Sequence, residues 1–218
     1  MIVDTVNHLK EVTGGSSGCG WMFDEVGLVL YSLVKLYKPD VVIQTGHLWG
    51  KSACMILEAM TDELRIERTE NNGDGAFSSF VRSRMGVQSK ESKLVSIDPG
   101  LVGGVNVDAG VKFLKERFGE RFEFFQMQSV RFFREQHDYL SVLTLGKKVF
   151  GVVDGDHTEE GCKQDLESLA NLSADVIFVD DTEWLKELNS VSRLFADRNG
   201  YNYLNLPYAN GVGILVRR

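Results

Sequence analysis

The sequence predicts an α/β fold in which a mostly parallel, doubly wound sheet of seven strands carries helices on both faces. Two observations lead to this prediction. Short β-branched or aromatic runs alternate with longer segments whose apolar residues recur at helical spacing. Near the C-terminus, two further apolar runs flank a proline and an Asn-Gly pair, which favours an antiparallel pair of strands.

The first strand of the parallel part is predicted at residues 40–45, a short β-branched run that ends at Gly46. The apolar positions after this glycine, up to Met60, have helical spacing and indicate a helix. A helix also precedes the strand, because apolar residues between Met22 and Tyr37 have the same spacing and a proline follows them. The segment therefore has the order helix, strand, glycine turn, helix.

The remaining predicted elements follow the same two patterns. In the last helix, Leu188, Val191 and Leu194 are expected to face inward. The other predicted strands lie at residues 93–97, 121–126, 149–153, 176–179, 201–206 and 212–217, and the other helices at 107–118, 140–145, 159–172 and 184–195.

The domain organisation follows from length and patterning. A chain of 218 residues can bury one substantial core, and no segment resembles a second core or a linker, so residues 1–218 are predicted to form a single domain. Within it, residues 1–38 form an N-terminal loop and helix. Residues 61–92 have mixed charge and little periodicity, which indicates an insertion, and loops of this length are usually functional, for example as lids.

Composition excludes several classes of function. The net charge of -7 and pI near 5.2 argue against a general nucleic-acid binder, so a small-molecule partner is expected. No apolar run could span a bilayer, and charged residues near the N-terminus argue against a signal peptide, so we predict a cytoplasmic protein without a membrane partner. Homo-oligomer formation stays open. Cys19, Cys54 and Cys162 lie too far apart for a zinc motif, and the last two fall at apolar helical positions.

Two neighbouring apolar runs, GVVDGDH and VIFVDD, each end in acidic residues. If both runs are adjacent parallel strands, Asp154, Asp180 and Asp181 reach the same edge of the sheet, and His157 lies just beyond the first of them. Three carboxylates at one place repel one another unless a cation or hydrogen-bond donors lie among them. This edge is therefore the predicted place of the chemistry.

A glycine turn follows the first strand. Gly46 and Gly50, in QTGHLWGKS, permit a tight turn and the close approach of a ligand to N–H groups at a helix start, although such spacing also serves ordinary packing. Asp98 ends the second strand, where it could accept hydrogen bonds from a ribose diol or cap a turn before Pro99 and Gly100. Together these features favour a ribose-bearing cofactor. A GxGxxG motif is absent, which makes NAD the second choice.

With these motifs, the chain resembles the class I S-adenosylmethionine-dependent methyltransferases. It resembles most the O-methyltransferase group that includes macrocin-type sugar methyltransferases and cephalosporin hydroxylase-like proteins. The resemblance extends from about Asp40 to the end and rests on QTGHLWGKSA, SIDP, VVDGDHTEEGCKQDLE and VDDT, of which DGDH and VDD are the specific part. One position departs from the family pattern: Gln44 stands where an acid commonly contacts the ammonium group of the cofactor's methionine.

The resemblance implies a Rossmann-like fold and a methyl transfer from S-adenosylmethionine to a hydroxyl of a small molecule such as a sugar, a phenol or a natural product. It implies a general base at His157, although this side chain could instead hydrogen-bond an acid of the metal site. It further implies a Mg²⁺ ion with the ligands Asp154, Asp180 and Asp181. The implied cofactor-binding residues are Gln44, Gly46, Gly50, Ser52, Asp98, Ser129 and Asp154.

Some of these acids have a simpler interpretation. Asp156 and Glu159 have the D-x-x-E spacing of a helix N-cap. Of Asp180 and Asp181, one could be a metal ligand and the other a cap for the helix that contains Trp184.

Rival functions use the same sheet edge. Because Gln44 replaces a charged contact with a neutral one, the chain could be a non-catalytic binding protein with a methyltransferase fold. A metal-dependent hydrolase or a nicotinamide-dependent enzyme is the other alternative.

Overall fold

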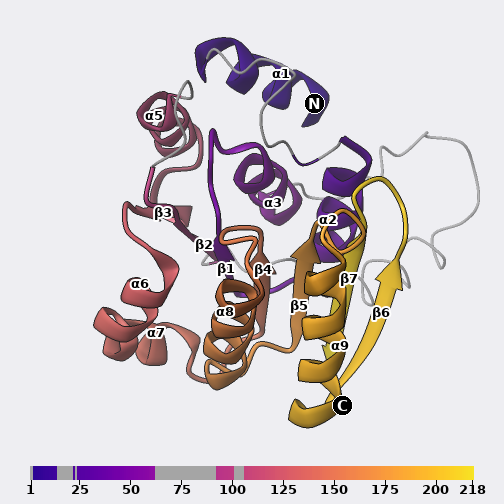
Figure 1. Ribbon diagram of the computed structural model, residues 1–218. Coiled ribbons are helices and arrows are strands. Elements are labelled where there is room, and N and C mark those ends of the chain that lie inside the picture. Colours follow the sequence, from indigo (N-terminus) through magenta and orange to yellow (C-terminus); the bar gives the residue numbers. More distant parts are fainter. Residues whose placement is uncertain (1, 14–21, 23, 62–91, 101–105) are drawn as a thin grey trace, which may run out of the picture.

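The structure is a computed structural model that describes residues 2–13, 22, 24–61, 92–100 and 106–218. Its strands form one sheet in the order β3-β2-β1-β4-β5-β7-β6 (Figure 1). The five strands β1 to β5 run parallel, and β7 pairs antiparallel with both β5 and β6, which confirms the predicted fold class. The strands are β1 Val41–Thr45, β2 Lys93–Ile97, β3 Phe122–Phe125, β4 Val149–Val153, β5 Val176–Asp180, β6 Tyr201–Leu206 and β7 Val212–Arg217.

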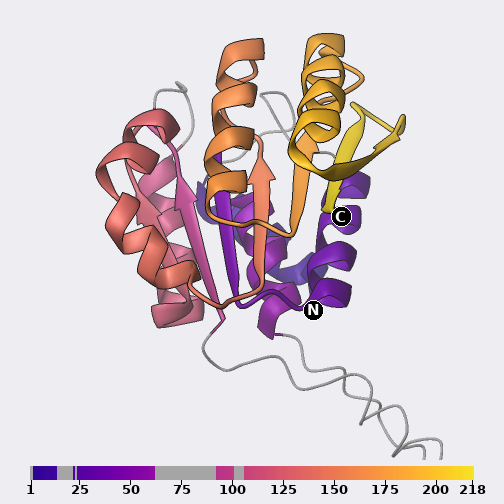
Figure 2. The same cartoon turned by 90° about the horizontal axis from the view of Figure 1, so that it is seen from below.

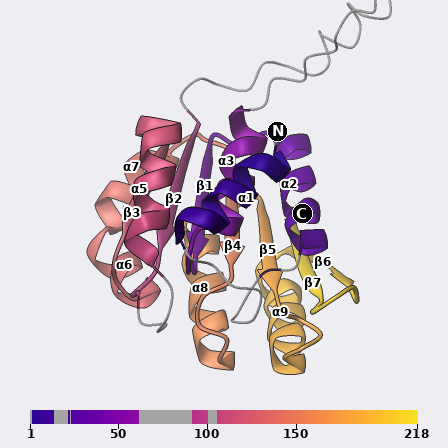
Figure 3. The same ribbon diagram turned by 90° about the horizontal axis from the view of Figure 1, so that it is seen from above.

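Helices cover both faces of the sheet, and Figure 3 shows α3 on one side with α8 and α9 on the other. Two hydrophobic clusters correspond to the two faces. One cluster packs the first helices, α1 Ile2–Thr13, α2 Asp24–Tyr37, α3 Lys51–Thr61 and α5 Val107–Phe118, against the sheet. The other cluster packs α6 Ser129–Glu135, α7 His137–Thr144, α8 Glu159–Asn171 and α9 Lys186–Asn199, and a short 3-10 turn, η1 Gly119–Arg121, precedes β3.

The central strands β1, β4 and β5 are buried along their whole length. Their side chains alternate between the two clusters: Val42 belongs to the first and Ile43 to the second. This continuous burial explains why these runs are apolar without interruption, as expected for parallel strands covered on both faces.

The strand order reverses between β1 and β4, because the chain moves outward from β1 to β2 and β3 and then returns to the other side of β1. In the register of the sheet, Thr45 is paired with Ile97 on β2 and with Val153 on β4. The residues that follow these strand ends, Gly46, Asp98 and Asp154, are therefore neighbours at one edge. Ligands of doubly wound sheets bind at this kind of crossing point.

The structure corrects three predictions about helices. The described part of residues 1–38 contains α1 in addition to the predicted helix α2, and α1 was not predicted. Helix α6 was not predicted, and α7 begins at His137 rather than at residue 140, because these helices of seven and eight residues are too short to show periodicity. In α9, Leu194 is exposed and Phe195 is buried in its place, since positions 188, 191 and 195 follow the helical repeat.

Helix α1 packs against α3 and α5, and a buried acid holds the three helices together. Glu58 on α3 accepts hydrogen bonds from the hydroxyl of Thr5 at 2.9 Å and from the guanidinium of Arg117 at 2.6 and 3.0 Å. None of the helices in the described ranges has both the length and the apolar composition that crossing a bilayer requires. Residues 62–91, nearly all of the predicted insertion, lie outside the described part of the chain.

Glu58→Gln is expected to lower the free energy of unfolding by about 1–3 kcal/mol, because the charge that attracts Arg117 is lost from a buried position. Urea denaturation of the variant and the wild type measures the difference. The control is Glu116→Gln on α5, whose pair with Lys112 is exposed and contributes little. Equal losses in the two variants would show that the buried pair has no special role.

Candidate active site

The two acidic strand ends meet at the carboxyl edge of the sheet. Asp154, His157 and Asp181 each offer one ligand atom within 4.8 Å of the others. The Nδ1 atom of His157 lies 3.4 Å from Oδ2 of Asp181. The structure thus brings together residues that are 27 positions apart in the sequence, as the two runs GVVDGDH and VIFVDD predicted.

Asp180 lies outside this group of ligand atoms. It is buried, and its Oδ1 accepts a hydrogen bond of 2.9 Å from the backbone N–H of Asp181. Of the predicted ligands, Asp154 and Asp181 belong to this group together with His157, and the role of Asp180 as a ligand stays a prediction. Asp180 is nevertheless close enough to Asp154 for its charge to raise the pKa of that residue.

The acidic cluster is short of positive charge. Burial raises the pKa of Asp154 well above its usual value, and the neighbouring Asp180, Asp181 and Asp98 raise it further. Burial and then the charge of Asp181 raise the pKa of Asp180 to about 7, whereas the backbone N–H of Asp181 and the charge of Lys51 act in the opposite direction. Buried carboxylates that repel one another, and whose pKa values are therefore raised, favour the binding of a cation or of a proton.

Asp181 has an unusual backbone, with a φ of 61° in the left-handed region. Asn210, in the loop between β6 and β7, holds it: its Nδ2 donates to Oδ1 of Asp181 at 2.9 Å, and its carbonyl oxygen accepts from the backbone N–H groups of Glu183 and Trp184. Backbone strain of this kind collects at functional sites. The sequence pattern indicated only a turn at Asn210, and no signal in it linked this residue to Asp181.

The glycine turn packs directly against the chain that follows β4. Gly46 has a φ of 82°, and a Cβ atom placed on it would lie 1.8 Å from the carbonyl oxygen of Asp154. Gly50 also has a positive φ, of 93°. No side chain fits at Gly46, so the turn and the acidic cluster are in backbone contact.

Gln44 and Ser52 fasten this turn to the start of α3. The Nε2 atom of Gln44 donates to the carbonyl oxygen of Gly46 at 2.6 Å and to Oγ of Ser52 at 2.5 Å. A carbonyl oxygen only accepts, which fixes the orientation of the Gln44 amide. Its Oε1 is buried and has no hydrogen-bond partner within the described ranges, so it is an acceptor available to a ligand.

Asp98 caps the glycine turn. Its Oδ2 accepts from the backbone N–H groups of His47 at 2.8 Å and Leu48 at 2.9 Å, and its Oδ1 accepts from that of Gly100 at 2.6 Å. Two N–H groups of the turn are therefore bound to this carboxylate. The turn interpretation of Asp98 is confirmed. A carboxylate can accept about four hydrogen bonds, so Asp98 keeps the capacity to bind a ribose, and this contact stays a prediction.

Thr158, and not Asp156, is the N-cap of α8. The Thr158 hydroxyl accepts from the backbone N–H of Gly161 at 3.0 Å. The side chain of Asp156, two residues earlier, accepts a hydrogen bond from the backbone N–H of Thr158 at 3.0 Å and so supports the cap. The D-x-x-E interpretation was wrong because the chain enters the helix two residues later than this spacing implies. The helix after Asp181 likewise has no side-chain cap, since its N-cap residue is Leu185.

Asp165 on α8 is an acidic residue that the sequence analysis missed. It is 1% exposed, and neither carboxylate oxygen has a well-aligned hydrogen-bond partner in the described part of the chain. Burial raises its pKa to about 6; the hydroxyls of Thr45 and Ser129 lower it, and the charge of Asp156 raises it. The available signal was an acid beside Cys162 and the leucines of the apolar face of α8.

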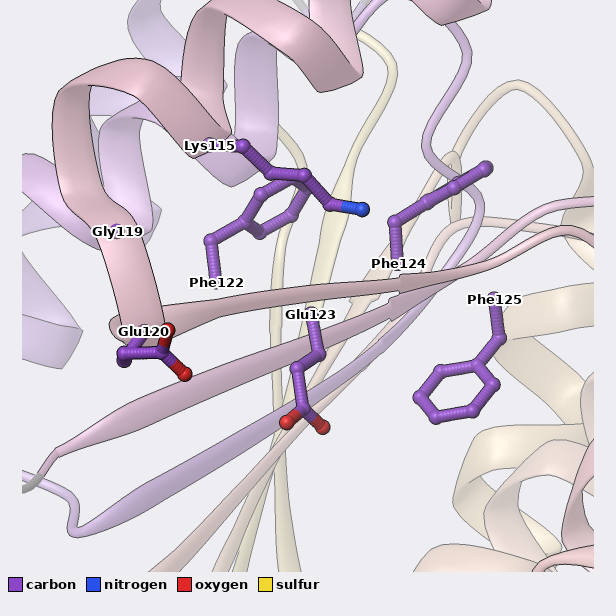
Figure 4. Close-up of a pocket in the computed structure, with 7 residues that line it drawn as sticks. All are labelled: Lys115, Gly119, Glu120, Phe122, Glu123, Phe124 and Phe125. Atoms are coloured by element: carbon purple, nitrogen blue, oxygen red, sulfur yellow. The ribbon is translucent and has the colours of Figure 1, made fainter.

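A separate pocket of about 400 Å³ lies at the outer edge of the sheet (Figure 4). Figure 4 shows Lys115 over Phe122 and Phe124, with Glu123 on the other side of the strand. The lining comes from the end of α5, from η1 and from β3, which is an edge strand. None of the predicted site residues lines this pocket.

Comparison with solved structures identifies the architecture. A methyltransferase from Geobacter sulfurreducens matches at 15% identity and a TM-score of 0.60 over 99% of this chain and 88% of its own. The O-methyltransferase TomG from Streptomyces achromogenes, solved in complex with SAM, matches at 11% identity and a TM-score of 0.67 over 100% and 90%. The chain has the methyltransferase fold. An O-methyltransferase from Bacillus cereus in complex with SAH matches at 12% identity and a TM-score of 0.65 over 98% and 91%.

No family model matches the sequence, and no curated protein is similar enough to match. At the identities of the structural matches, the likeness establishes the fold alone. What the methyltransferase fold does in this chain depends on the side chains at the carboxyl edge.

Asp165→Asn is expected to increase stability at neutral pH. The folded-state pKa of Asp165, about 6, lies above the value of 3.8 for an ordinary aspartate, so its ionisation destabilises the fold above pH 6. This difference corresponds to about 3 kcal/mol as an upper estimate, and the penalty disappears as the pH falls toward 4. Urea denaturation at several pH values between 4 and 8 measures it.

The control for this prediction is Glu167→Gln, which makes the same change of charge at an exposed position of α8. We expect the stability gain of Asp165→Asn over this control to shrink as the pH is lowered. A variant that is less stable than the wild type at pH 7.5 would contradict the prediction.

Proposed function

We propose that this protein is an S-adenosylmethionine-dependent O-methyltransferase that acts on a hydroxyl of a small molecule with the assistance of a divalent cation such as Mg²⁺. The observation that carries the proposal is the backbone contact between Gly46 and Asp154. Because of this contact, the glycine turn, which suits a cofactor, lies next to the acidic cluster, which suits the hydroxyl that accepts the methyl group. The proteins TomG and the Bacillus cereus enzyme share the fold and were solved with SAM and SAH.

The residues at the glycine turn fit the cofactor. The buried Oε1 of Gln44 lacks a partner among the described residues, and an ammonium group such as that of the cofactor's methionine would satisfy it. Ser52 holds the same amide in place. We assign Gln44, Gly46, Gly50 and Ser52 to the methionine half of the cofactor, which supplies the methyl group from its sulfonium.

The acidic cluster fits a divalent cation. Asp154 and Asp181 offer carboxylate oxygens, which suit Mg²⁺ or Mn²⁺. Asp180 stabilises the position of Asp181 by accepting a hydrogen bond from its backbone N–H. A cation at this place would make the acceptor hydroxyl more acidic.

His157 is placed to act as the general base. Its Nδ1 faces Asp181, so a proton held on Nδ1 leaves Nε2 free to accept the proton of the acceptor hydroxyl. The side chain is 37% exposed, which gives a route by which this proton reaches water. Asp181 in turn stabilises the imidazolium that forms. S-adenosylmethionine, when bound, would supply the methyl group to the deprotonated oxygen and would leave as S-adenosylhomocysteine.

A second candidate function is ligand binding without catalysis. It is favoured by Asp98, which occupies the N–H groups of His47 and Leu48, and by the neutral Gln44. The finer resemblance to macrocin-type and cephalosporin hydroxylase-like proteins supports the catalytic alternative, because it rests on the acids that form the cluster.

The cofactor assignment predicts that S-adenosylhomocysteine binds to the purified protein. Gln44→Ala is expected to weaken this binding about tenfold, because the ammonium group loses a buried acceptor and the turn loses a hydrogen-bonded contact. Isothermal titration calorimetry measures both constants. The control is Gln164→Ala on α8, whose amide pairs with Glu160 at the surface. Absence of binding to the wild type would refute the cofactor assignment.

The catalytic assignment predicts Mg²⁺- or Mn²⁺-stimulated methyl transfer to members of a panel of catechols, sugars and hydroxylated natural products. His157→Ala is expected to lower kcat by about 10²–10⁴, the usual contribution of a general base, while the affinity for S-adenosylhomocysteine is unchanged. Asp154→Asn is expected to abolish the metal stimulation. Radiolabelled methyl transfer measures both effects.

The matched control for the base is His137→Ala, which removes an exposed histidine that also neighbours an aspartate. Cofactor binding without transfer to any acceptor would favour the non-catalytic alternative. Full activity in His157→Ala would exclude this residue as the base.

A further inference from the structure

Asn210, in the loop between β6 and β7, holds the chain that follows β5 at three points. Its Nδ2 donates to Oδ1 of Asp181 at 2.9 Å, and its carbonyl oxygen accepts from the backbone N–H groups of Glu183 at 2.7 Å and Trp184 at 2.9 Å. Figure 2 shows the yellow hairpin of β6 and β7 next to β5 at one edge of the sheet. One residue therefore binds the acidic cluster with its side chain and the neighbouring turn with its backbone.

The bond from Asn210 distinguishes the two carboxylate oxygens of Asp181. Oδ1 accepts from the amide, whereas Oδ2 lies 3.4 Å from Nδ1 of His157, with which Asp181 and Asp154 form the cluster. The terminal torsion of an aspartate has a broad range, so a carboxylate without this bond would adopt several orientations. The amide of Asn210 selects the orientation in which Oδ2 lies near His157.

The backbone of Asp181 is held by other bonds. Its φ of 61° is unfavourable for most residues other than glycine and persists where neighbouring groups maintain it. The backbone N–H of Asp181 donates to Oδ1 of Asp180 at 2.9 Å, and its carbonyl oxygen accepts from the N–H of Leu185 at 2.9 Å. The side chain of Asn210 therefore restrains the carboxylate, while these two bonds restrain the main chain.

The loop also keeps its connection to the turn without the Asn210 amide. The carbonyl oxygen of Gly211 accepts from the backbone N–H of Thr182 at 3.3 Å, and the N–H of Gly211 donates to the carbonyl oxygen of Tyr208 at 2.9 Å. A Cβ atom placed on Gly211 would lie 2.4 Å from the backbone nitrogen of Glu183, so the two segments are in backbone contact. Removing the amide is thus expected to change one contact of Asp181 and to leave the loop in place.

We propose that Asn210 is a positioning residue of the proposed metal site, whose amide orients the carboxylate of Asp181 so that Oδ2 can bind the cation together with Asp154. The inference rests on the proposed function, because this orientation affects metal binding only if a cation occupies the cluster. Asn210 acts through Asp181, since its amide nitrogen is a hydrogen-bond donor and not a metal ligand. Groups that hydrogen-bond a metal ligand in this way contribute about 10–100-fold to metal affinity.

A positioning role differs measurably from a purely structural one. A structural asparagine, when removed, lowers the melting temperature and leaves the metal affinity of the folded protein unchanged. A positioning asparagine weakens metal binding in the folded protein. It leaves the affinity for S-adenosylhomocysteine unchanged, because Gln44 and Asp98 hold the glycine turn.

The experiment titrates Mn²⁺ into the wild type, Asn210→Ala, Asp181→Asn and the double variant, with free Mn²⁺ measured by electron paramagnetic resonance. Asn210→Ala is expected to raise the Kd for Mn²⁺ about tenfold. Asp181→Asn is expected to raise it further, and the double variant little beyond that, because both changes act on the same ligand. The control is Asn202→Ala, which removes an exposed asparagine of β6 and should bind Mn²⁺ like the wild type.

A second variant guards against a folding defect. Asn210→Leu has a side chain of similar shape without a donor, and the same loss of Mn²⁺ affinity is expected. Melting temperatures and calorimetric titrations with S-adenosylhomocysteine accompany both variants. Whichever of the two folds like the wild type must bind Mn²⁺ more weakly than Asn202→Ala does, or the proposed role of Asn210 is wrong.

The outcomes separate this inference from the function on which it rests. A wild type that binds no Mn²⁺ at millimolar concentration overturns the metal assignment and this inference together, while binding of S-adenosylhomocysteine tests the cofactor assignment by itself. A wild type that binds Mn²⁺, with Asn210→Ala indistinguishable from Asn202→Ala, overturns the role of Asn210 alone. Additive losses in the double variant would show that Asn210 does not act through Asp181.

Discussion

The site depends on one steric constraint, the contact between the backbone of Gly46 and the carbonyl oxygen of Asp154. A Cβ atom at Gly46 would lie 1.8 Å from that oxygen, so only glycine permits the turn after β1 to touch the chain after β4. The parallel register of the two strands brings their ends level, and the missing side chain closes the remaining gap. Turn and acids thereby form one continuous surface where the strand order reverses.

This contact has an electrostatic consequence. Asp98, Asp180 and Asp181 lie near Asp154, and burial, followed by the charges of these three residues, raises the pKa of Asp154. The fold neutralises only part of this charge. Asp98 accepts hydrogen bonds from three backbone N–H groups and Asp181 accepts one from Asn210, whereas the described residues give the carboxylate of Asp154 no comparable donor. Carboxylates whose charge is compensated only in part favour the binding of a cation.

The sequence was sufficient for the sheet and for the convergence of its acidic ends, because buried parallel strands leave uninterrupted apolar runs and the acids follow them directly. It was insufficient where tertiary contacts decide. Asp180 and Asp181 are adjacent in the chain, yet only the second joins Asp154 and His157. Asn210 and Asp165 are brought to the edge by packing between elements distant in sequence, and no local pattern predicts such contacts. Helices α1 and α6 were missed because their stability comes from neighbours rather than from periodicity.

The central claim is that the glycine turn and the acidic cluster form a single site for a methyl donor and its acceptor. A crystal structure of the protein grown with S-adenosylhomocysteine and Mn²⁺ tests it most directly, because the anomalous signal of manganese locates the ion independently. We expect the ligand's amino group near Gln44, its sulfur facing Asp154, and the ion between Asp154 and Asp181. A ligand bound instead in the pocket at the outer edge of β3, or manganese bound away from both acids, would contradict the account.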